Sequence, residues 1–273
     1  MKLKSKISAL PYIAWILVFT IIPFILVIYY AFTSHKTGGF SLENIVDSSY
    51  FLPVLIKSVC LAFIATLICL VIAYPLAYIM SRKSAAVQRV FMMLIMLPMW
   101  MNFLLRTYAW MTILEDNGII NNTLEFLGLP TLQLINTSGA VVLGMVYNYL
   151  PFMVLPLFSI MTKIDKNVIE AAQDLGCNSL TVIRKVVFPL SFPGIATGIT
   201  MTFVPCVSTF IISRLLGGSD CYLIGDLIEE QFKLKGAGFH AGSATSLVLM
   251  IVVLISMGIL NQFDNDEMED SLK

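Results

Sequence analysis

Polar residues interrupt an otherwise apolar sequence at Glu170-Ala171-Ala172-Gln173-Asp174-Leu175-Gly176, and nine residues further on the chain continues Val186-Val187-Phe188-Pro189. The first part predicts an amphipathic helix that ends at the glycine, because glycine readily adopts the backbone conformation that closes a helix. A second, short basic helix follows, and Pro189 starts the next apolar stretch. The pattern indicates a docking surface in a cytoplasmic loop. From the residues alone, a solvated connector is the alternative.

Composition places the chain among integral membrane proteins. Hydrophobic residues make up 58% and charged residues 12% of the 273 residues, and the mean hydropathy is +0.86. A helix needs about 20 apolar residues to cross the hydrocarbon core, and the long apolar stretches exclude an outer-membrane barrel. We expect an all-α polytopic protein with one membrane domain, residues 1–273, and six transmembrane helices near residues 11–32, 54–80, 89–112, 139–162, 190–213 and 242–262.

The distribution of positive charge predicts the orientation. The first apolar stretch is too long for a cleaved signal and lacks a small-residue cleavage site, so we expect a retained span with a kink at Pro23. With the N-terminus inside, eleven of the seventeen Lys and Arg residues lie in cytoplasmic segments. Six spans then put both termini in the cytoplasm, together with the loop 163–188.

That loop resembles the EAA loop of binding-protein-dependent ABC importer permeases. The family pattern has Glu-Ala-Ala, three residues, Gly, nine residues and then Ile-x-Leu-Pro. The chain has Glu170, Ala171, Ala172, Gly176 and Pro189 at that spacing, with valine and phenylalanine as apolar replacements for isoleucine and leucine. The resemblance extends over all six spans.

The resemblance implies a fold like that of type I importer permeases, in the bacterial plasma (inner) membrane. It implies that the loop is a coupling helix in a cleft of an ATPase, with Glu170 as a polar contact, Ala171 and Ala172 as the packing surface and Gly176 as the turn. The implied partners are a second permease, two cytoplasmic ATPase subunits and an extracytoplasmic binding protein. The ATPase, and not this chain, would hold ATP and Mg²⁺.

Further segments are similar to spermidine/putrescine permeases, and the likeness is to the first of that importer's two membrane subunits. They are Leu105–Trp110, Pro205 with Ser208-Thr209-Phe210, and the stretch Leu215–Gly225. A polyamine cargo implies acceptors for positive charge, yet no Asp or Glu lies inside the six spans. Carboxylates gather instead at the expected outer mouth, where they could concentrate a cation or be ordinary solvated loop charges: Glu115, Asp116, Asp220, Asp226 and Glu229.

Candidate path residues lie on spans three to five. Aromatic faces can hold an ammonium group, although each ring could equally belong to an interfacial belt. Arg106 shares one helix stripe with an amide and an indole, where it would repel a polyamine or suit an anion. We expect a structural or gating role, with a mouth carboxylate as a candidate partner. The hydroxyl and thiol residues of span five could line the path or pack helices. The candidates are Trp100, Asn102, Arg106, Tyr108, Trp110, Tyr147, Thr202, Cys206 and Thr209.

Several functions are excluded by missing patterns. The sequence has no Gly-x-x-x-x-Gly-Lys-Ser/Thr phosphate loop, no catalytic signature and no metal-binding spacing among its five cysteines and two histidines. We therefore expect no catalytic or metal site, no bound cofactor and no nucleic-acid partner. The hypothesis is an ABC importer permease for spermidine or putrescine. The alternatives are the same machine for another solute such as an inorganic anion, or an ATP-independent channel or carrier.

Overall fold

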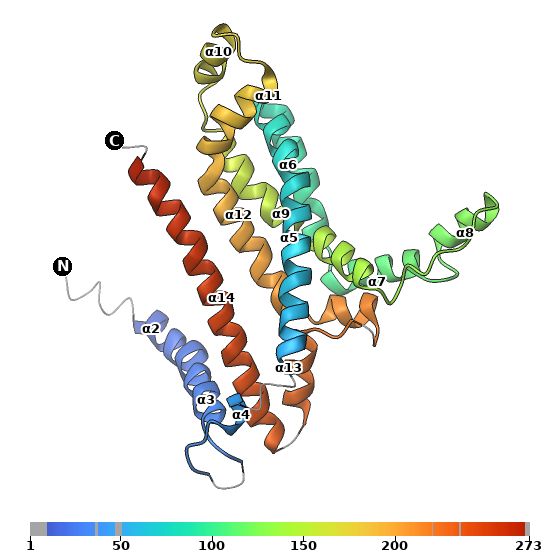
Figure 1. Cartoon of the computed structure of the whole chain (residues 1–273), viewed down its shortest axis with the longest axis vertical. Coiled ribbons are helices and arrows are strands. Elements are labelled where there is room, and N and C mark those ends of the chain that lie inside the picture. Colours follow the sequence, from blue (N-terminus) through green and yellow to red (C-terminus); the bar gives the residue numbers. More distant parts are fainter. Residues whose placement is uncertain (1–9, 36–37, 47–50, 220, 235, 271–273) are drawn as a thin grey trace. The chain divides into compact units, whose positions relative to one another are not determined.

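The computed structural model describes residues 10–35, 38–46, 51–219, 221–234 and 236–270. Within these ranges the regular secondary structure is helical, joined by turns and loops, and an isolated antiparallel bridge links Thr33 and Phe40. The helices, labelled in Figure 1, are α2 (Leu10–Ile16), α3 (Ile22–Ala31), α4 (Glu43–Val46), α5 (Leu52–Ser81), α6 (Ala85–Met96), α7 (Phe103–Leu114), α8 (Ile119–Phe126), α9 (Ser138–Met161), α10 (Lys166–Asp174), α11 (Ser179–Val182), α12 (Phe188–Ser208), α13 (Ile224–Lys233) and α14 (Ala237–Asp270).

Five helical stretches among the described residues are long and apolar enough to cross a membrane, and a bent pair of helices is a sixth candidate. Four of them lie close to the apolar stretches that predicted them: Pro11–Ala31, Leu52–Ser81, Ser138–Met161 and Ala237–Ile259. The fifth, Ser179–Ser208, begins well before the expected residue 190 and ends before residue 213. The polytopic all-α class is confirmed.

The third expected span, near 89–112, is broken. The segment Ala85–Trp100 meets Phe103–Phe126 at 89°, across Met101 and Asn102. Pro98 lies in a 3-10 turn at the end of the first helix, and the side chain of Asn102 accepts a hydrogen bond from Leu104 N at 2.8 Å, which starts α7. A proline and an N-capping asparagine together favour a break over a continuous helix.

Two compact units make up the described chain. One comprises the residues up to Leu55 with Leu227–Val253, and the other comprises Ile56–Asp226 with the residues from Leu254. In the first unit α3 packs on α14 through Ala31, Ala244 and Leu247. Nδ1 of His240 also lies 2.6 Å from the carbonyl oxygen of Thr33, which joins α14 to the end of α3.

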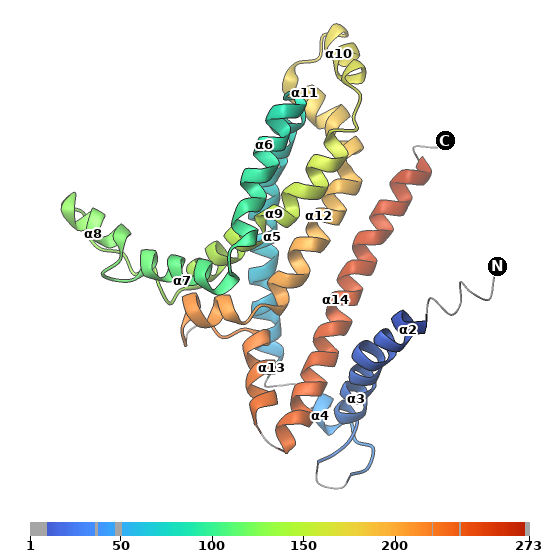
Figure 2. The same cartoon turned by 180° about the vertical axis from the view of Figure 1, so that it is seen from behind.

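The second unit is built around α5, α9 and α12, which lie side by side in Figures 1 and 2. Its core includes the sulfur-containing and aliphatic residues Cys69, Met80, Met153, Leu157 and Ile195. Helices α9 and α12 approach most closely at two glycines of α12. A Cβ at Gly194 would lie 3.1 Å from the carbonyl oxygen of Pro156, and one at Gly198 would lie 2.7 Å from Sδ of Met153.

Two prolines in the spans follow π-helical turns. Leu17–Ile21 precedes Pro23, and Ile183–Val187 precedes Pro189. In the second case the amide of Phe188 donates to Ile183 O, one residue further back than in an α-helix. Such a shift lets a helix pass a residue without an amide hydrogen, as a membrane span requires. The helix from Ser179 therefore runs on into α12, and the expected separate basic helix is instead its first part.

Replacing Gly198 by valine is expected to destabilise the protein, because the added carbons would push α9 away from α12. Overpacking of this kind typically costs about 1–3 kcal/mol. Gly258→Val is the matched control, since a Cβ at Gly258 meets nothing within 4 Å. Thermal unfolding in detergent checks the prediction: Gly198→Val should unfold several degrees lower than Gly258→Val. Equal midpoints would contradict close packing at Gly198.

Candidate functional site

The segment between α9 and α12 contains a helix that is closed at both ends. At its start, Oδ1 of Asp165 accepts a hydrogen bond from Asn167 N at 3.0 Å. At its end, Gly176 has φ +85°, Gly176 N donates to Gln173 O at 2.8 Å, and Cys177 N donates to Ala172 O at 3.1 Å. This pair of bonds is the Schellman arrangement. Both ends of α10 are therefore fixed by local hydrogen bonds.

The helix α10 has an inner and an outer apolar face. Ile169 is buried with Ile164, Val182 and Val187, and Ala172 packs against this cluster. On the other side three exposed apolar residues recur at helical spacing: Val168, Ala171 and Leu175. The side chain of Leu175 is 86% exposed. Ala171 and Ala172 therefore do not share one packing surface, as the sequence had suggested, because only Ala171 lies on the outer side.

Arg82 fastens the base of this segment. Its Nη2 donates to Met161 O at 3.0 Å and its Nη1 to Ile164 O at 3.4 Å, and the guanidinium lies 5.4 Å from the ring centroid of Tyr78. The last carbonyl groups of a helix lack partners inside the helix and carry partial negative charge. Arg82 thus joins the end of α5 to the point at which the chain leaves α9.

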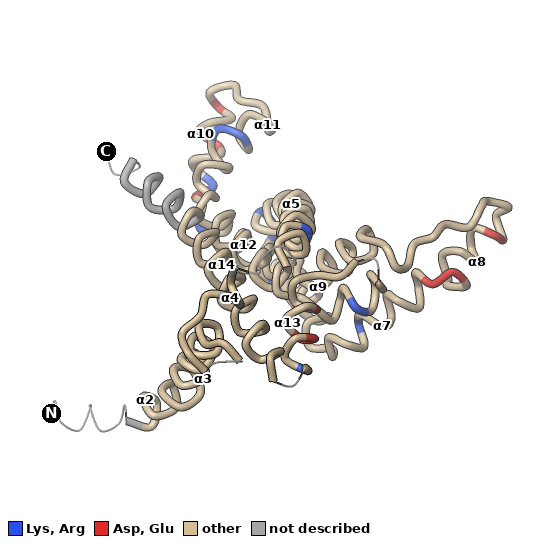
Figure 3. Tube along the Cα trace, turned by 60° about the horizontal axis from the view of Figure 1, so that its bottom comes forward, with Lys and Arg blue, Asp and Glu red and all other residues tan. Residues whose placement is uncertain are grey.

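The helix that follows this segment, α11, is also capped at its start. Oδ1 of Asn178 accepts a hydrogen bond from Thr181 N at 2.8 Å and starts α11. Glu170, the expected polar contact, is exposed, as are Gln173 and Asp174. Figure 3 shows that α10 and the residues after it carry both signs of charge. The outer face thus combines exposed aliphatic groups with charged neighbours, which is the composition of a protein contact surface.

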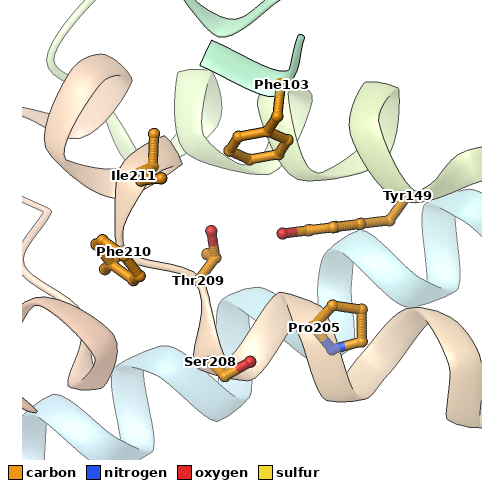
Figure 4. Close-up of a pocket in the computed structure, with 7 residues that line it drawn as sticks. All are labelled: Phe103, Tyr149, Pro205, Ser208, Thr209, Phe210 and Ile211. Carbon is orange, nitrogen blue, oxygen red and sulfur yellow. The ribbon is translucent and has the colours of Figure 1, made fainter. Parts of the chain in front are cut away.

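A pocket of about 190 Å³ lies where α12 ends. It is lined by Phe103, Tyr149, Pro205, Ser208, Thr209, Phe210 and Ile211 (Figure 4). Thr209 has an extended backbone with ψ 144° and terminates α12. The hydroxyl of Tyr149 points toward the side chain of Thr209 (Figure 4). The pocket thus presents two aromatic rings and hydroxyl groups beside a helix C-terminus.

At Thr209, where α12 ends, the backbone of Gly225 packs directly against the helix C-terminus. A Cβ at Gly225 would lie 2.5 Å from Thr209 O and 2.8 Å from Ser208 O, so only glycine lets the start of α13 approach these carbonyl groups. The start of α13 is held by Ser58, whose Oγ accepts from Ile224 N at 2.7 Å, and by Asp226, which accepts from Leu223 N at 3.0 Å.

Only some of the predicted path residues lie near one another or line the pocket. The rings of Trp110 and Tyr147 are in edge contact with centroids 5.4 Å apart, and Thr209 lines the pocket. Thr202 and Cys206 are fully buried and are not among its lining residues. Three others are exposed and also lie outside it: Trp100, Asn102 and Tyr108.

Sequence reasoning did not select Phe103 or Ile211, which both line the pocket. The available signal was the pair of breaks, since Asn102 starts the helix that carries Phe103, and Thr209 separates α12 from Ile211.

Arg106 is 92% buried, with 8% of its surface exposed, and its Nε and Nη1 have no hydrogen-bond partner. Its guanidinium lies 5.9 Å from the ring centroid of Phe103, and its charge acts on Tyr149. It therefore stands beside the pocket, although it does not line it. The expected pairing with a mouth carboxylate is absent among the described residues.

The carboxylates expected at one mouth have different surroundings. Glu115 and Asp116 line a cleft of about 380 Å³ with Asn117 and Asn136. Asp226 is buried and caps α13, so it does not face solvent as a mouth residue would. Glu229 belongs to the other unit and forms an ion pair with Lys233 at 2.7 Å. Asp220 lies outside the described residues.

Comparison with known proteins adds independent information. The model of the family described as binding-protein-dependent transport system inner membrane component matches residues 70–263. The spermidine/putrescine transport system permease protein PotB of Escherichia coli K12 is 36% identical over 251 residues, which are 88% of this chain and 90% of that protein. PotB of Haemophilus influenzae is 34% identical over 260 residues, 92% of this chain and 91% of that protein.

A solved bacterial ABC transporter, involved in the import of the acidic polysaccharide alginate, contains a chain of the same fold. The TM-score is 0.80 at 19% identity, covering 96% of this chain and 94% of that chain. At this identity the likeness concerns the fold alone. The match of the family model over most of the sequence and the 36% identity with PotB lead to the same conclusion: the chain belongs to the family of binding-protein-dependent transport system inner membrane components, the permease subunits of ABC importers.

Proposed function

We propose that the chain is one of two permease subunits in an ATP-driven importer of polyamines such as spermidine and putrescine. Its partners are a second permease, two copies of a cytoplasmic ATPase that holds ATP and Mg²⁺, and an extracytoplasmic protein that delivers the solute. The 36% sequence identity with PotB, which extends over 88% of the chain, supports the cargo class. The observation that carries the ATP-driven part is α10, a helix capped at both ends with an exposed apolar face.

The ATPase docks on the outer face of α10, so both termini and this loop are cytoplasmic. Leu175, Val168 and Ala171 enter the ATPase groove, while Ile169 and Ala172 attach the helix to its own bundle. Glu170 and Asp174 lie beside this face and supply charged contacts at its rim. Caps at both ends keep α10 rigid, so that a push on the outer face moves the whole helix.

Motion passes from this loop to the pocket through one continuous helix. The helical stretch Ser179–Ser208 has 30 residues, which is about 45 Å at 1.5 Å per residue. Its first residues follow the Gly176 turn, and its last residues line the pocket. Closure of the two ATPase copies would therefore displace the pocket wall formed by Pro205 and Ser208, as a rigid-body movement.

The pocket suits an alkylammonium group. The faces of Tyr149 and Phe103 attract a cation, and the C-terminus of α12 carries partial negative charge. The hydroxyls of Ser208 and Thr209 accept hydrogen bonds from an ammonium group. Since none of the seven lining residues is a carboxylate, binding is weak enough for release.

One observation favours a different cargo. The unpartnered Nε and Nη1 of Arg106 beside the pocket would suit an inorganic anion, which binds well to a guanidinium. The second candidate function is therefore an ABC importer of such an anion.

Reconstitution separates these functions. The complex of both permeases, the ATPase and the binding protein is placed in proteoliposomes, and ATP hydrolysis and uptake are measured with spermidine, putrescine, sulfate or phosphate. We expect either polyamine to stimulate both. Stimulation by an anion alone would overturn the cargo class. Solute uptake by this chain without any ATPase would overturn the importer mechanism.

Gly176→Ala is expected to uncouple ATP hydrolysis from uptake. An alanine at φ +85° is strained by about 1–2 kcal/mol, and relief of that strain opens the turn that sets α10. Gly176→Asn should retain more activity, because asparagine tolerates this conformation. Gly128→Ala is the control, since Gly128 has φ +70° and likewise has open space around its Cβ position. Wild-type coupling in Gly176→Ala would contradict the docking role.

Leu175→Ser is expected to weaken ATPase binding about 10-fold without lowering the unfolding temperature. The leucine is mostly exposed in the free chain, so its apolar surface is buried only by a partner, which is worth about 1.5–3 kcal/mol. Leu127→Ser, at an exposed leucine that follows α8, is the control. Co-purification of the ATPase with each variant measures the effect. Equal retention by both variants would show that Leu175 lies outside the contact.

Tyr149→Leu is expected to raise the KM for polyamine uptake about 2- to 30-fold, the range that corresponds to a cation–π contact of about 0.5–2 kcal/mol. Tyr149→Phe keeps the ring and loses only the hydroxyl that meets Thr209, so its KM should rise less. Tyr108→Leu is the control, because that exposed ring does not line the pocket. Uptake kinetics in proteoliposomes give the values. Equal effects at both tyrosines would rule out a specific role for the pocket.

A further inference from the structure

Arg106 is a buried cation without an acceptor. Two of its nitrogen atoms, Nε and Nη1, are enclosed and form no hydrogen bond. A guanidinium group remains protonated in proteins, and burying it is costly unless charged or polar groups satisfy its donors. Helix α7 brings it next to the ring of Phe103, which attracts the cation but accepts no strong hydrogen bond. The chain by itself therefore leaves this residue incomplete.

No acid among the described residues completes it. No Asp or Glu occurs in the six apolar stretches of the sequence. Among the described carboxylates near this end of the second unit, Glu115 and Asp116 line a separate cleft with Met111, and neither is bonded to Arg106. The hydroxyl of Tyr149 points toward Thr209 (Figure 4), and neither Nε nor Nη1 of Arg106 is bonded to it. No residue that the structure describes therefore supplies the acceptor.

Access from outside exists on the same helix. Arg106 as a whole residue retains 8% exposure, and Nη2 is not one of its enclosed nitrogens. Its neighbours in sequence Leu104, Leu105 and Tyr108 are exposed apolar residues. A lipid tail covering this surface offers no hydrogen-bond acceptor. A protein helix covering it can present a carboxylate, which accepts a charge-assisted hydrogen bond from the guanidinium at Nη2.

We propose that Arg106 is a binding site for a carboxylate that the second permease subunit contributes, next to the pocket lined by Phe103 and Tyr149. The proposal rests on the proposed function, because it requires a second permease. The carboxylate neutralises a charge that would otherwise repel a polyamine. It also supplies the acid that the pocket lacks, so an entering ammonium group competes with Arg106 for it and loosens the contact between the subunits.

A double-mutant cycle tests this pairing in the full complex. Arg106→Met removes the charge at similar length, and each Asp and Glu in the apolar segments of the second permease is changed in turn to Asn or Gln. Co-purification of the two permeases and polyamine-stimulated ATP hydrolysis are measured. We expect Arg106→Met to lower both at least 10-fold. One acidic neutralisation should restore co-purification to within about 3-fold of wild type, whereas polyamine-stimulated hydrolysis should stay low because the acid that meets the ammonium group is missing.

Two further variants keep the test decisive. Arg106→Lys retains the charge but replaces the planar guanidinium with a flexible ammonium group, so it should fall between wild type and Arg106→Met. Leu105→Met is the control for altered packing on α7 and should behave as wild type. Two results would show that no carboxylate of the second permease pairs with Arg106. In one, no acidic neutralisation rescues Arg106→Met. In the other, the loss caused by Arg106→Met and the loss caused by each neutralisation add up in the double variant.

Other occupants give other results. Loss of sulfate- or phosphate-stimulated hydrolysis in Arg106→Met, with unchanged permease assembly, would assign the residue to an anionic cargo and overturn the proposal. The wild-type complex could need anionic lipid for hydrolysis while Arg106→Met does not. That result would assign Arg106 to a lipid headgroup and would also overturn the proposal. If the wild-type chain forms no complex with a second permease, or no loaded binding protein stimulates hydrolysis, the proposed function fails and this inference fails with it.

Discussion

The close packing of α9 against α12 is the constraint on which both candidate sites depend. Gly194 and Gly198 bring the two backbones together beside Pro156 and Met153, in a unit where larger side chains would separate them. That contact sets the direction of the continuous helix Ser179–Ser208, and with it the positions of the Gly176 turn at one end and the pocket at the other. In lipid, where apolar burial gives little drive for helix association, small residues of this kind are the main source of tight packing.

Features with a local cause could be predicted from the sequence. The apolar stretches are as long as a bilayer is thick, so most spans follow from length alone. The ends of α10 follow from Asp165 and Gly176, because a capping carboxylate and a left-handed glycine act within a few residues. Asn178 starts the next helix for the same reason. These short-range rules do not need the rest of the fold.

Features with a tertiary cause could not be predicted in this way. The family resemblance grouped Ala171 with Ala172 as one packing surface, but the buried cluster around Ile169 decides which alanine faces inward. Asp226 looked like a mouth charge, yet it satisfies an amide at the start of α13. The 89° break at Met101 and the passage of the helix through Pro189 depend on how backbone hydrogen bonds are redistributed, which proline alone does not determine.

The two candidate sites differ in how much of their chemistry this chain contains. The α10 segment is complete, since its caps, its buried face and its exposed face all come from local residues and Arg82 holds its base. The pocket is incomplete, because its rings and hydroxyls have no acidic partner and the neighbouring Arg106 has no acceptor. A path that must release its cargo gains from weak sites shared between subunits, since a site that held a polycation tightly on its own would slow transport. Selectivity for such a cargo then belongs to the assembly, whereas the response to the ATPase is built into this chain.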